Sequence, residues 1–504
     1  MQPVPDFFMN DFDKPKLSPK EQKSLDRYNA WTRFMAMSIG RVAPGLAINY
    51  VRRRNALASY SAATLSGPNQ AWRPTNKTAD EIIKTDHAML RARARSLVRN
   101  SSHVAGAMRK ITNNVVYKGI RPQSENETAE KAWKEWADAV KWHEIETLVV
   151  RHWWQDGEIF VHYYPDQDLA DAGLIPLGVE LLECDHLDTT QTGPDGDGRG
   201  TWKQGILLSP TKKPLGYQLY PEHPGDSAWI SYGNSVFLPS LMTDHLFLKD
   251  RISQHRGVPW LHSIIMEMRD FSEFQSNERL AQRLMSAFGI FLKTVYPEHI
   301  PSGAPLGGTG DITIDDVPDY IEPARVQALP PGVEPYSVSY DRPGRTYEPF
   351  VKTSLRGVST GINMSYEAFT NDYTDASYSS ARSASLEERR GYQVQQLFLV
   401  NQLHQSAWRR LWFMNSLTRT VPGIPEVVPV EWQFPGWPWV DPDKDSKAAE
   451  RDIKNGIDSR HEVVSSRGKD YGKIQADLDK EEKDGFPKGG DTTAINTETN
   501  TDEN

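Results

Sequence analysis

The chain has 504 residues, of which 38% are apolar, and its formal net charge is −9 at neutral pH. This length is too great for one hydrophobic core, so we expect two to four domains. The low apolar share is typical of an elongated protein or of one that completes its burial in an oligomer, and the negative charge argues against a protein that wraps DNA with a broad basic face.

Cys184 is the only cysteine, so an intrachain disulfide and a cysteine-based metal cluster are both excluded, and a reducing setting is the simplest interpretation. No run of 18 apolar residues occurs in the sequence, so no helix is expected to span a membrane.

Residues 1–55 are polar and irregular, and a helical pattern follows over 78–116, with a break expected near 100–102. The arginines at positions 91–99 decorate this helix. A solvated or acid-paired face is favoured for them over a nucleic-acid patch. Residues 129–154 predict one tryptophan-rich helix, residues 159–164 predict a strand, and residues 155–250 are rich in strand patterns, so the fold class is α+β.

A long helix is predicted from Pro259 to its stop at Gly289, because the roughly 30 residues between them lack both glycine and proline. Such a helix would be about 45 Å long, which suggests a strut. One side is apolar, and much of the rest is acidic through Glu267, Asp270, Glu273 and Glu278. Residues 290–345 are rich in proline and glycine, with room for short strands, and a second helix is expected from Pro349 to Gly361.

The stretch YTDASYSSARSASLEERRG, residues 373–391, is dense in small residues at the mouth of another long helix, expected over about 380–417. That helix should bury an apolar stripe made of Val394, Leu397, Val400, His404, Ala407, Leu411 and Met414. Residues 446–483 predict a charged helical segment. The last residues, from Pro487 to Asn504, have almost no apolar content and are expected to be disordered and dispensable for assembly.

The small-residue stretch leaves three interpretations open at first: a catalytic serine, a flexible hinge or a crowded helix junction. It contains no G-x-S-x-G elbow and no strand leads into it, so helix capping and close packing are favoured over a nucleophile. The spacing of Asp441, Asp443 and Asp445 matches the first three ligand positions of a calcium-binding loop. Ser446 stands where that loop needs glycine, so a helix start is the better interpretation.

Signals for enzyme chemistry are weak elsewhere. His143, His152 and His162 lack metal-site spacing, so no metal and no cofactor is expected, and GPDGDGRG at 193–200 lacks the lysine of a phosphate loop. Fifteen tryptophans leave a carbohydrate-active enzyme as the main alternative, although packing is the favoured role for those beside prolines. A nucleic-acid-binding module built on the arginines of 91–99 is a third possibility.

An ordered set of sequence blocks resembles the lambda-type portal proteins of tailed bacteriophages, over about residues 56–478. The blocks include DGEIFV, GYQLY, HLFLKDRISQHRGVPWL and WPWVDPDK. The most recognisable part holds a Leu-x-Pro-Gly segment at 329–332, a Gly-x-x-Tyr-Glu type helix end at 361–367, and a Tyr-Ser-Ser-Ala-Arg signature at 378–382.

The resemblance implies a portal fold assembled as a ring of about twelve subunits. It implies the following divisions: an N-terminal extension (1–55), a mixed α/β wing (56–256 and 381–440), two stem helices (257–289 and 346–362), a β-containing clip (290–345), a tunnel loop (363–380), a helical crown (441–485) and a tail (486–504).

The function implied is a DNA channel at one capsid vertex that nucleates head assembly, without enzyme activity. The implied partners are double-stranded DNA, the terminase large subunit, head-completion or adaptor proteins, and the major capsid and scaffold proteins, with no membrane. The protein would belong to the virion, and to the host cytoplasm during assembly.

The tunnel loop and stem supply the expected site residues. Asp372, Tyr373, Thr374, Asp375 and Tyr378 are expected to face the DNA, and the four stem acids Glu267, Asp270, Glu273 and Glu278 to line the channel. Acidic side chains there would repel phosphates, so contact with DNA would be brief. Ser379, Ser380, Ala381 and Ser383 are expected to pack near a neighbouring subunit, where small side chains let the ring close.

Overall fold

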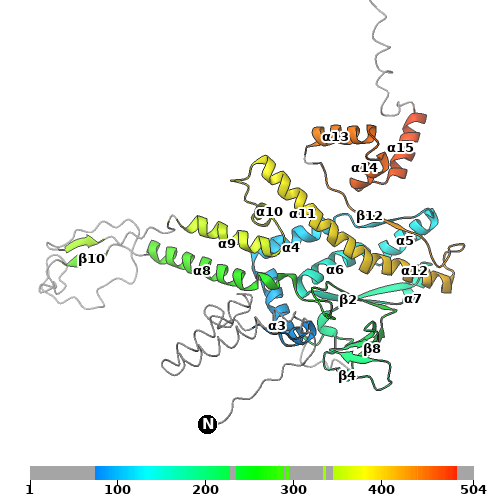
Figure 1. Ribbon diagram of the computed structural model, residues 1–504, viewed down its shortest axis with the longest axis horizontal. Coiled ribbons are helices and arrows are strands. Elements are labelled where there is room, and N and C mark those ends of the chain that lie inside the picture. Colours follow the sequence, from blue (N-terminus) through cyan, green and yellow to red (C-terminus); the bar gives the residue numbers. More distant parts are fainter. Residues whose placement is uncertain are drawn as a thin grey trace, which may run out of the picture. The chain divides into compact units, whose positions relative to one another are not determined.

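The computed structural model describes residues 74–226, 234–287, 291–294, 333–336, 344, 346–439 and 441–484. The chain divides into two units, Met1–Lys77 and Thr78–Asn504, and all the elements described below belong to the second. These elements confirm the α+β class: helices and antiparallel sheets succeed one another along the chain (Figure 1).

The described helices are α3 (Ala79–Asn100), α4 (Ser102–Val115), α5 (Glu127–Ala139), α6 (Trp142–Asp156), α7 (Gln167–Asp171), α8 (Ile265–Ala287), α9 (Tyr347–Gly361), α10 (Tyr366–Thr370), α11 (Tyr378–Leu399), α12 (Gln405–Thr418), α13 (Pro442–Lys454), α14 (Arg460–Ser466) and α15 (Tyr471–Lys483). Two short 3-10 helices, η3 (Cys184–His186) and η4 (Trp260–Ser263), and a π-helical turn, η6 (Val400–His404), join them.

The described strands are β1 (Arg121–Gln123), β2 (Glu158–Pro165), β3 (Leu177–Glu183), β4 (Gly193–Pro194), β5 (Thr201–Lys203), β6 (Ile206–Leu208), β7 (Pro214–Leu219), β8 (Val236–Pro239), β9 (Thr243–Phe247), β10 (Phe291–Thr294), β11 (Val333–Tyr336) and β12 (Glu431–Gln433). They form antiparallel sheets in the orders β3-β2-β9, β4-β5-β6-β7-β8, β1-β12 and β10-β11. Most of the clip expected at 290–345 lies outside the described residues, apart from the β10-β11 pair.

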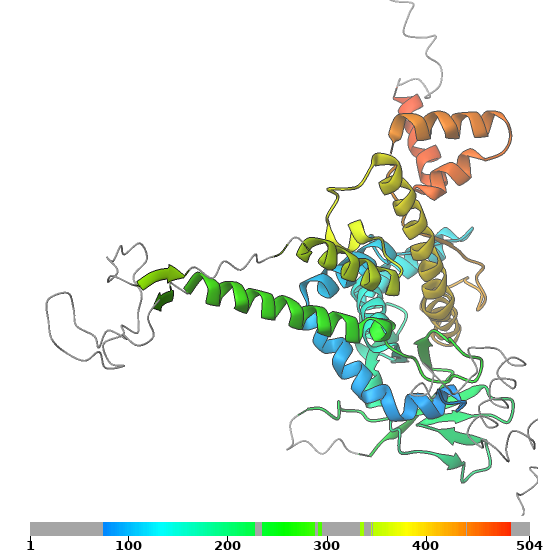
Figure 2. The same ribbon diagram turned by 60° about the vertical axis from the view of Figure 1, so that its left-hand side comes forward.

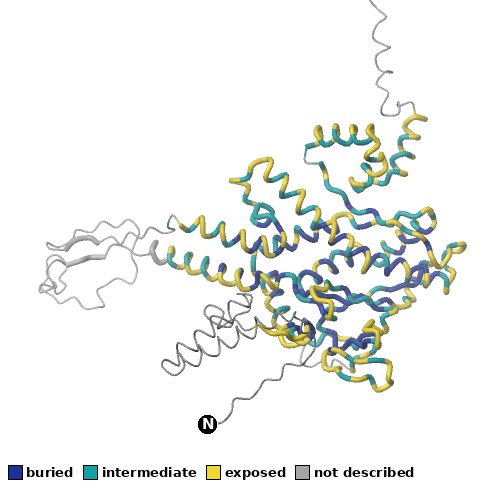
Figure 3. The backbone as a smooth tube through the Cα atoms, viewed as in Figure 1, coloured by how far each residue is buried: buried dark blue, intermediate teal, exposed yellow. Residues whose placement is uncertain are grey.

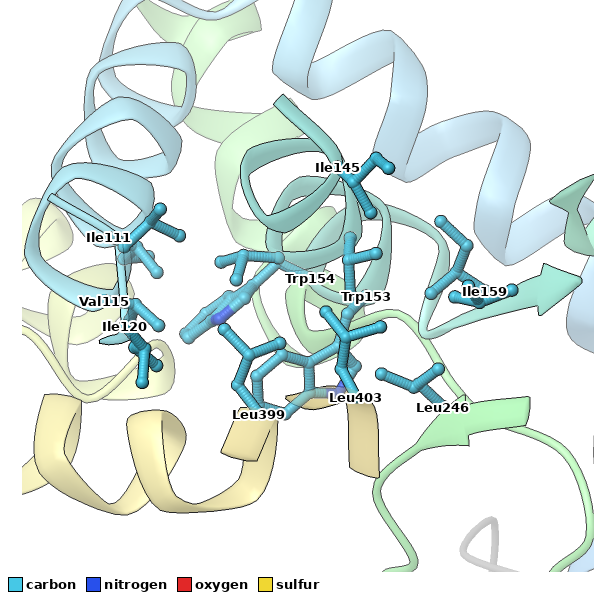
Figure 4. Packing of buried hydrophobic residues seen from close by; sticks show 14 of the residues in the cluster. Ile111, Val115, Ile120, Ile145, Trp153, Trp154, Ile159, Leu246, Leu399 and Leu403 are labelled. Atoms are coloured by element: carbon cyan, nitrogen blue, oxygen red, sulfur yellow. The ribbon is translucent and has the colours of Figure 1, made fainter. Parts of the chain in front are cut away.

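Tryptophan rings form the centre of the main core. Each of these side chains is at most 4% exposed: Trp133, Trp136, Trp142, Trp153, Trp154, Trp408 and Trp412. Trp133 and Trp408 have ring centroids 5.3 Å apart, although 275 positions separate them in the chain (408 − 133). Figure 4 shows Trp153 and Trp154 among aliphatic side chains from α4, β2 and α11–η6. The rings therefore hold helices together and do not line a sugar-binding cleft.

The break expected after the first helix falls at Ser101, which caps α4 by accepting from the Val104 amide. The next predicted helix differs from the structure. The single helix expected over 129–154 is wrong: it is two helices, α5 and α6, with Lys141 between them in the left-handed region at φ +55°. No glycine or proline marks this turn, which brings Trp142 within 5.5 Å of Trp133.

The strut helix begins later than expected, because Pro259 precedes the 3-10 turn η4 and α8 starts at Ile265. A buried ion pair fixes this entry: Arg256 donates through Nε to both carboxylate oxygens of Glu158, and both side chains are at most 1% exposed. Farther along, Phe274 of α8 contacts Tyr347 and Phe350 of α9, with ring centroids 5.8 and 4.7 Å away, so the two helices lie side by side.

The apolar stripe predicted for residues 380–417 is partly wrong. Val394 is 69% exposed and Leu397 is 52% exposed, while Gln395 and Gln396 are buried. Five residues of π-helix at η6 interrupt α11–α12, and the wider turn changes which face is buried. Beyond η6 the stripe is buried as predicted, through residues such as Ala407 and Leu411.

Helices α13–α15 carry no fully buried residue, and Figure 3 shows them exposed or half-buried throughout. Asp441 caps α13 by accepting from the Lys444 amide, and Asp443 pairs with Lys447, 2.9 Å away. Asp445 pairs with Arg382 of α11 at 2.7 Å. These contacts confirm that the three aspartates mark a helix start.

Candidate functional site

The segment from α10 to the start of α11 carries most of the expected site residues. It follows α9, and the short helix α10 packs on both α9 and α4 (Figure 2). Ser365 caps α10 by accepting from the Ala368 amide, and the Ser365 amide donates to Glu388 of α11 at 2.7 Å. Asn371, at φ +60°, ends α10 and begins the loop.

Asp372 organises the loop from within. Its Oδ1 accepts from the Thr374 hydroxyl at 2.6 Å and from the Thr374 amide at 3.1 Å, and its Oδ2 accepts from the Tyr366 hydroxyl at 2.9 Å. The Thr374 hydrogen bonds are the main reason why the pKa of Asp372 is lowered to about 2. The side chain is therefore a fixed anion at neutral pH.

Asp375 is tied to the second stem helix. Lys352 of α9 donates to Asp375 Oδ2 at 2.8 Å, and it also pairs with Glu348, one helical turn earlier, at 2.9 Å. The hydrogen bond to Asp375 is the largest cause of the raised pKa of Lys352. One of the two loop acids is thus compensated by a cation within the same subunit.

Lys110 of α4 holds the other end of the loop. Its Nζ donates to the Ala368 carbonyl and to Asn371 Oδ1. Neither Lys110 nor Lys352 was predicted as a site residue, because each is distant in sequence from the loop and neither belongs to a recognisable motif. The i, i+4 spacing of Glu348 and Lys352 is the one sequence pattern that involves either lysine, and it predicts only a surface ion pair within α9.

The small residues lie in the first turns of α11. Ser377, and not Ser379 or Ser380, is the cap, since its hydroxyl accepts from the Ser380 amide at 3.2 Å. Ser379, Ser380 and Ser383 are exposed within the single chain, and Ala381 is half-buried. None of the four is buried by its own chain.

The two tyrosines expected to face the DNA are both more than half exposed, Tyr373 at 57% and Tyr378 at 58%. The Tyr378 hydroxyl donates to Asp441 at the start of α13, at a distance of 3.5 Å. The end of the loop is thereby connected to the C-terminal helices.

Helix α8 separates its charges by side. Glu267, Asp270 and Glu273 are exposed and Glu278 is half-buried. At 3.6 residues per turn these four acids fall within an arc of about 140°, and the arginines at positions 269, 279 and 283 fall on the opposite side. The acidic strip is therefore real, but the helix as a whole carries only one more acid than base, four against three.

Among the arginines of α3, Arg91 and Arg95 are acid-paired and Arg93 and Arg99 are exposed, which confirms the solvated or acid-paired face favoured from the sequence. Arg91 donates to Asp185 at 2.9 Å, and Arg95 donates to Asp156, Glu183 and Asp185 at 2.6–3.0 Å. His152, Asp156 and Glu183 come together with spacing that would suit a metal ion. The Arg95 guanidinium already supplies positive charge there, which argues against a cation.

Comparison with known proteins places the chain in a family. The model of the phage portal proteins of the lambda family matches residues 66–396, more than half of the chain. The probable portal protein of Halomonas phage phiHAP-1 is 27% identical over 83% of this chain and 86% of its own length. Portal protein B of Escherichia phage lambda is 22% identical over 81% of this chain and 86% of its own.

Among solved structures, a chain from the neck of an empty gene transfer agent particle is similar, with a TM-score of 0.43 and 12% identity over 79% of this chain and 96% of that one.

The match of the family model shows that the protein belongs to the lambda family of phage portal proteins. It is accordingly a structural, non-enzymatic component of the bacteriophage virion. No described helix is long and apolar enough to cross a membrane.

Proposed function

We propose that this portal protein forms a closed ring of about twelve copies that surrounds double-stranded DNA at one capsid vertex. The observation that carries the proposal is the loop between α10 and α11. It exposes Tyr373 and Tyr378, contains a fixed anion at Asp372, and is held to α4 and α9 by Lys110 and Lys352.

Such a loop suits contact with a moving polyanion. Both phenol side chains are exposed, and the two acids give phosphates nothing to bind. Because the loop is anchored at both ends, it would keep its position while DNA moves past it. The acidic strip of α8, Glu267, Asp270, Glu273 and Glu278, would line the channel beside it.

Subunit packing is proposed along the outer face of α11. Leu386, Val394 and Leu397 are 46–69% exposed and fall within an arc of about 80° on this helix, next to Ser383. Exposed apolar side chains that follow one face suit contact with a second protein surface. The first turn of α11 carries the small residues Ser379, Ser380 and Ala381, which would let neighbouring copies approach closely.

The remaining roles follow the proposed division of the chain. Residues 257–289 and 346–362 would be the stem, 363–380 the tunnel loop, 56–256 and 381–440 the wing, and 441–485 the crown. The clip at 290–345 would dock the terminase large subunit during packaging and the head-completion or adaptor proteins afterwards. The ring would nucleate head assembly with the major capsid and scaffold proteins.

An in vitro packaging assay tests the DNA-facing role. Replacing Asp372 and Asp375 with lysine should leave the native mass of the assembly unchanged, while packaging or genome retention falls, because phosphates would be held and the contacts of the two aspartates within the subunit would be lost. Unimpaired packaging by intact rings of this variant would contradict the role proposed for the loop.

A further inference from the structure

A cavity of about 530 Å³ lies where three distant segments meet. One wall is the turn after α4, residues 117–121. A second is the last residue of β12 and the segment that follows it, residues 433–439, and the third is the turn between α14 and α15, residues 467–469. None of the roles proposed above uses this cavity.

The lining is positively charged in a chain that is negative overall. Lys118, Arg121, Arg467 and Lys469 all line the cavity, all four are exposed, and no carboxylate belongs to the lining. Among the described residues, none of the four forms an ion pair. Lysines elsewhere on α13 and α15 behave differently: Lys447, for example, pairs with Asp443 at 2.9 Å.

The walls are fixed by close packing. Gly436 and Gly468 touch through their backbones: a Cβ built on Gly436 would lie 2.5 Å from the Gly468 nitrogen, and Gly468 has φ +69°. The Arg467 guanidinium lies 3.4 Å from the centroid of the Trp439 ring. Trp437 Nε1 donates to Asn114 Oδ1 at 2.9 Å. The cations therefore surround a rigid aromatic surface.

A buried donor in the lining has no partner. Gln433 is 9% exposed and lines the cavity, and its side-chain nitrogen has no hydrogen-bond partner among the described residues. A buried N–H group without an acceptor is unfavourable.

We infer that this cavity binds the phosphodiester backbone of duplex DNA, with Lys118, Arg121, Arg467 and Lys469 neutralising adjacent phosphates. The inference rests on the proposed function in one respect, namely that duplex DNA reaches this protein. The position of the cations favours a backbone over an inserted acidic peptide. They lie exposed around the opening, where a solvated polyanion can cross, and Gln433 is the one polar side chain of the lining that is buried. The contact would be independent of base sequence.

Fluorescence anisotropy with a labelled duplex, measured on the full-length protein at several NaCl concentrations, tests the inference. The variant K118Q/R467Q/K469Q should bind at least about 10-fold more weakly. The slope of log affinity against log salt should become shallower by about 2–3, since each phosphate contact contributes about 0.9. The control K447Q/K454Q/K473Q removes the same charge from lysines of α13 and α15 that lie outside the cavity lining, and it should bind within about 2-fold of the unmodified protein.

Three outcomes would overturn the inference: no duplex binding by the unmodified protein, equal weakening by both triple variants, or displacement of the duplex by polyglutamate at equal charge concentration. The last would assign the cavity to an acidic protein partner. Native mass measured on the same samples separates this question from ring formation. Monomers that still need the three cations to bind duplex would contradict the ring and leave the cavity assignment standing.

Discussion

At the scale of single residues, buried charges fix the point where the sheet meets the stem. Glu158 accepts hydrogen bonds from Arg256, from His245 Nε2 at 2.9 Å and from the Gly257 amide at 2.8 Å. Burial raises the pKa of Glu158, but the Arg256 charge and the hydrogen bond from His245 together outweigh this and hold the pKa well below its usual value. The first turn of the stem therefore depends on one buried carboxylate.

Replacing Arg256 with methionine should destabilise the fold by about 3–5 kcal/mol, because it leaves the Glu158 charge buried without its main partner. The double variant E158Q/R256M removes both charges and should recover much of that loss. Urea unfolding of the two variants measures the difference. If R256M alone is as stable as the double variant, the ion pair does not hold this junction.

His87 gives the fold a dependence on pH. Burial is the main reason why its pKa is lowered to about 3, and its Nδ1 already accepts from Arg91 at 3.0 Å. The unfolded chain takes up this proton near pH 6.5 and the folded chain does not. Stability should therefore fall as pH drops from about 6.5 toward 3, by up to about 1.4 kcal/mol per pH unit from this residue.

The variant H87Q should show a shallower fall in unfolding free energy between pH 7 and pH 5 than the unmodified protein. The carboxylates with lowered pKa, such as Asp156 and Glu158, lose their contribution only below about pH 4, outside this window. Denaturant unfolding at both pH values is the measurement. Identical slopes for the two proteins would rule out a neutral, buried His87.

At the scale of elements, the ion pair between Lys352 and Asp375 connects stem helix α9 to the loop. Removing either partner breaks the same contact but shifts the charge in opposite directions. K352Q makes the loop region more negative and D375N makes it more neutral. If charge controls DNA passage, packaging should change in opposite directions in the two variants. If the position of the loop controls it, both should be impaired alike, by at least several-fold.

An in vitro packaging assay on rings of verified native mass distinguishes these cases, with K447Q on the crown as a control for the loss of one lysine. We expect impairment in both variants, since the contact at 2.8 Å anchors the loop. Normal packaging by both variants would show that the anchor is unnecessary.

Helix boundaries show how far the sequence alone could predict these elements. The break near 100–102 and the helix start at the aspartates of 441–445 were predictable, because capping is a local interaction between a side chain and amides two or three residues ahead. The break at Lys141 and the π-helical turn at η6 were not, because no glycine or proline marks them and tertiary packing selects them. Gln395 is buried because it accepts from Trp154, 241 positions earlier, and periodicity cannot reveal such a contact.

The candidate site also has a part that the sequence predicted and a part that it did not. The small-residue stretch and the acids of the loop were visible as composition. The contacts that position them, from Lys110 and Lys352, depend on how α4 and α9 pack, and only the three-dimensional structure reveals them. Even within the stretch, Ser377 was not distinguishable as the cap from the serines beside it.

At the scale of the whole molecule, the apolar face of α11 is the proposed contact between copies. Replacing Val394 and Leu397 with glutamate should leave the monomer folded, because both side chains are more than half exposed. Burying a charge in an apolar contact is costly, so the assembly should dissociate into smaller species at micromolar concentration. The matched control is V427E/I457E, which adds the same two charges at positions that are 79% and 74% exposed. Native mass of both variants is the measurement, and unchanged assembly of V394E/L397E would exclude this face.

The proposed assembly is a closed ring with the loop between α10 and α11 at its centre. A cryo-EM reconstruction of the purified full-length protein tests this arrangement most directly. We predict a closed ring of about twelve copies, with residues 371–378 nearest the axis and the outer face of α11 against a neighbouring copy. Monomers under all salt conditions, or a ring in which these residues lie on the outer rim, would contradict the proposed function.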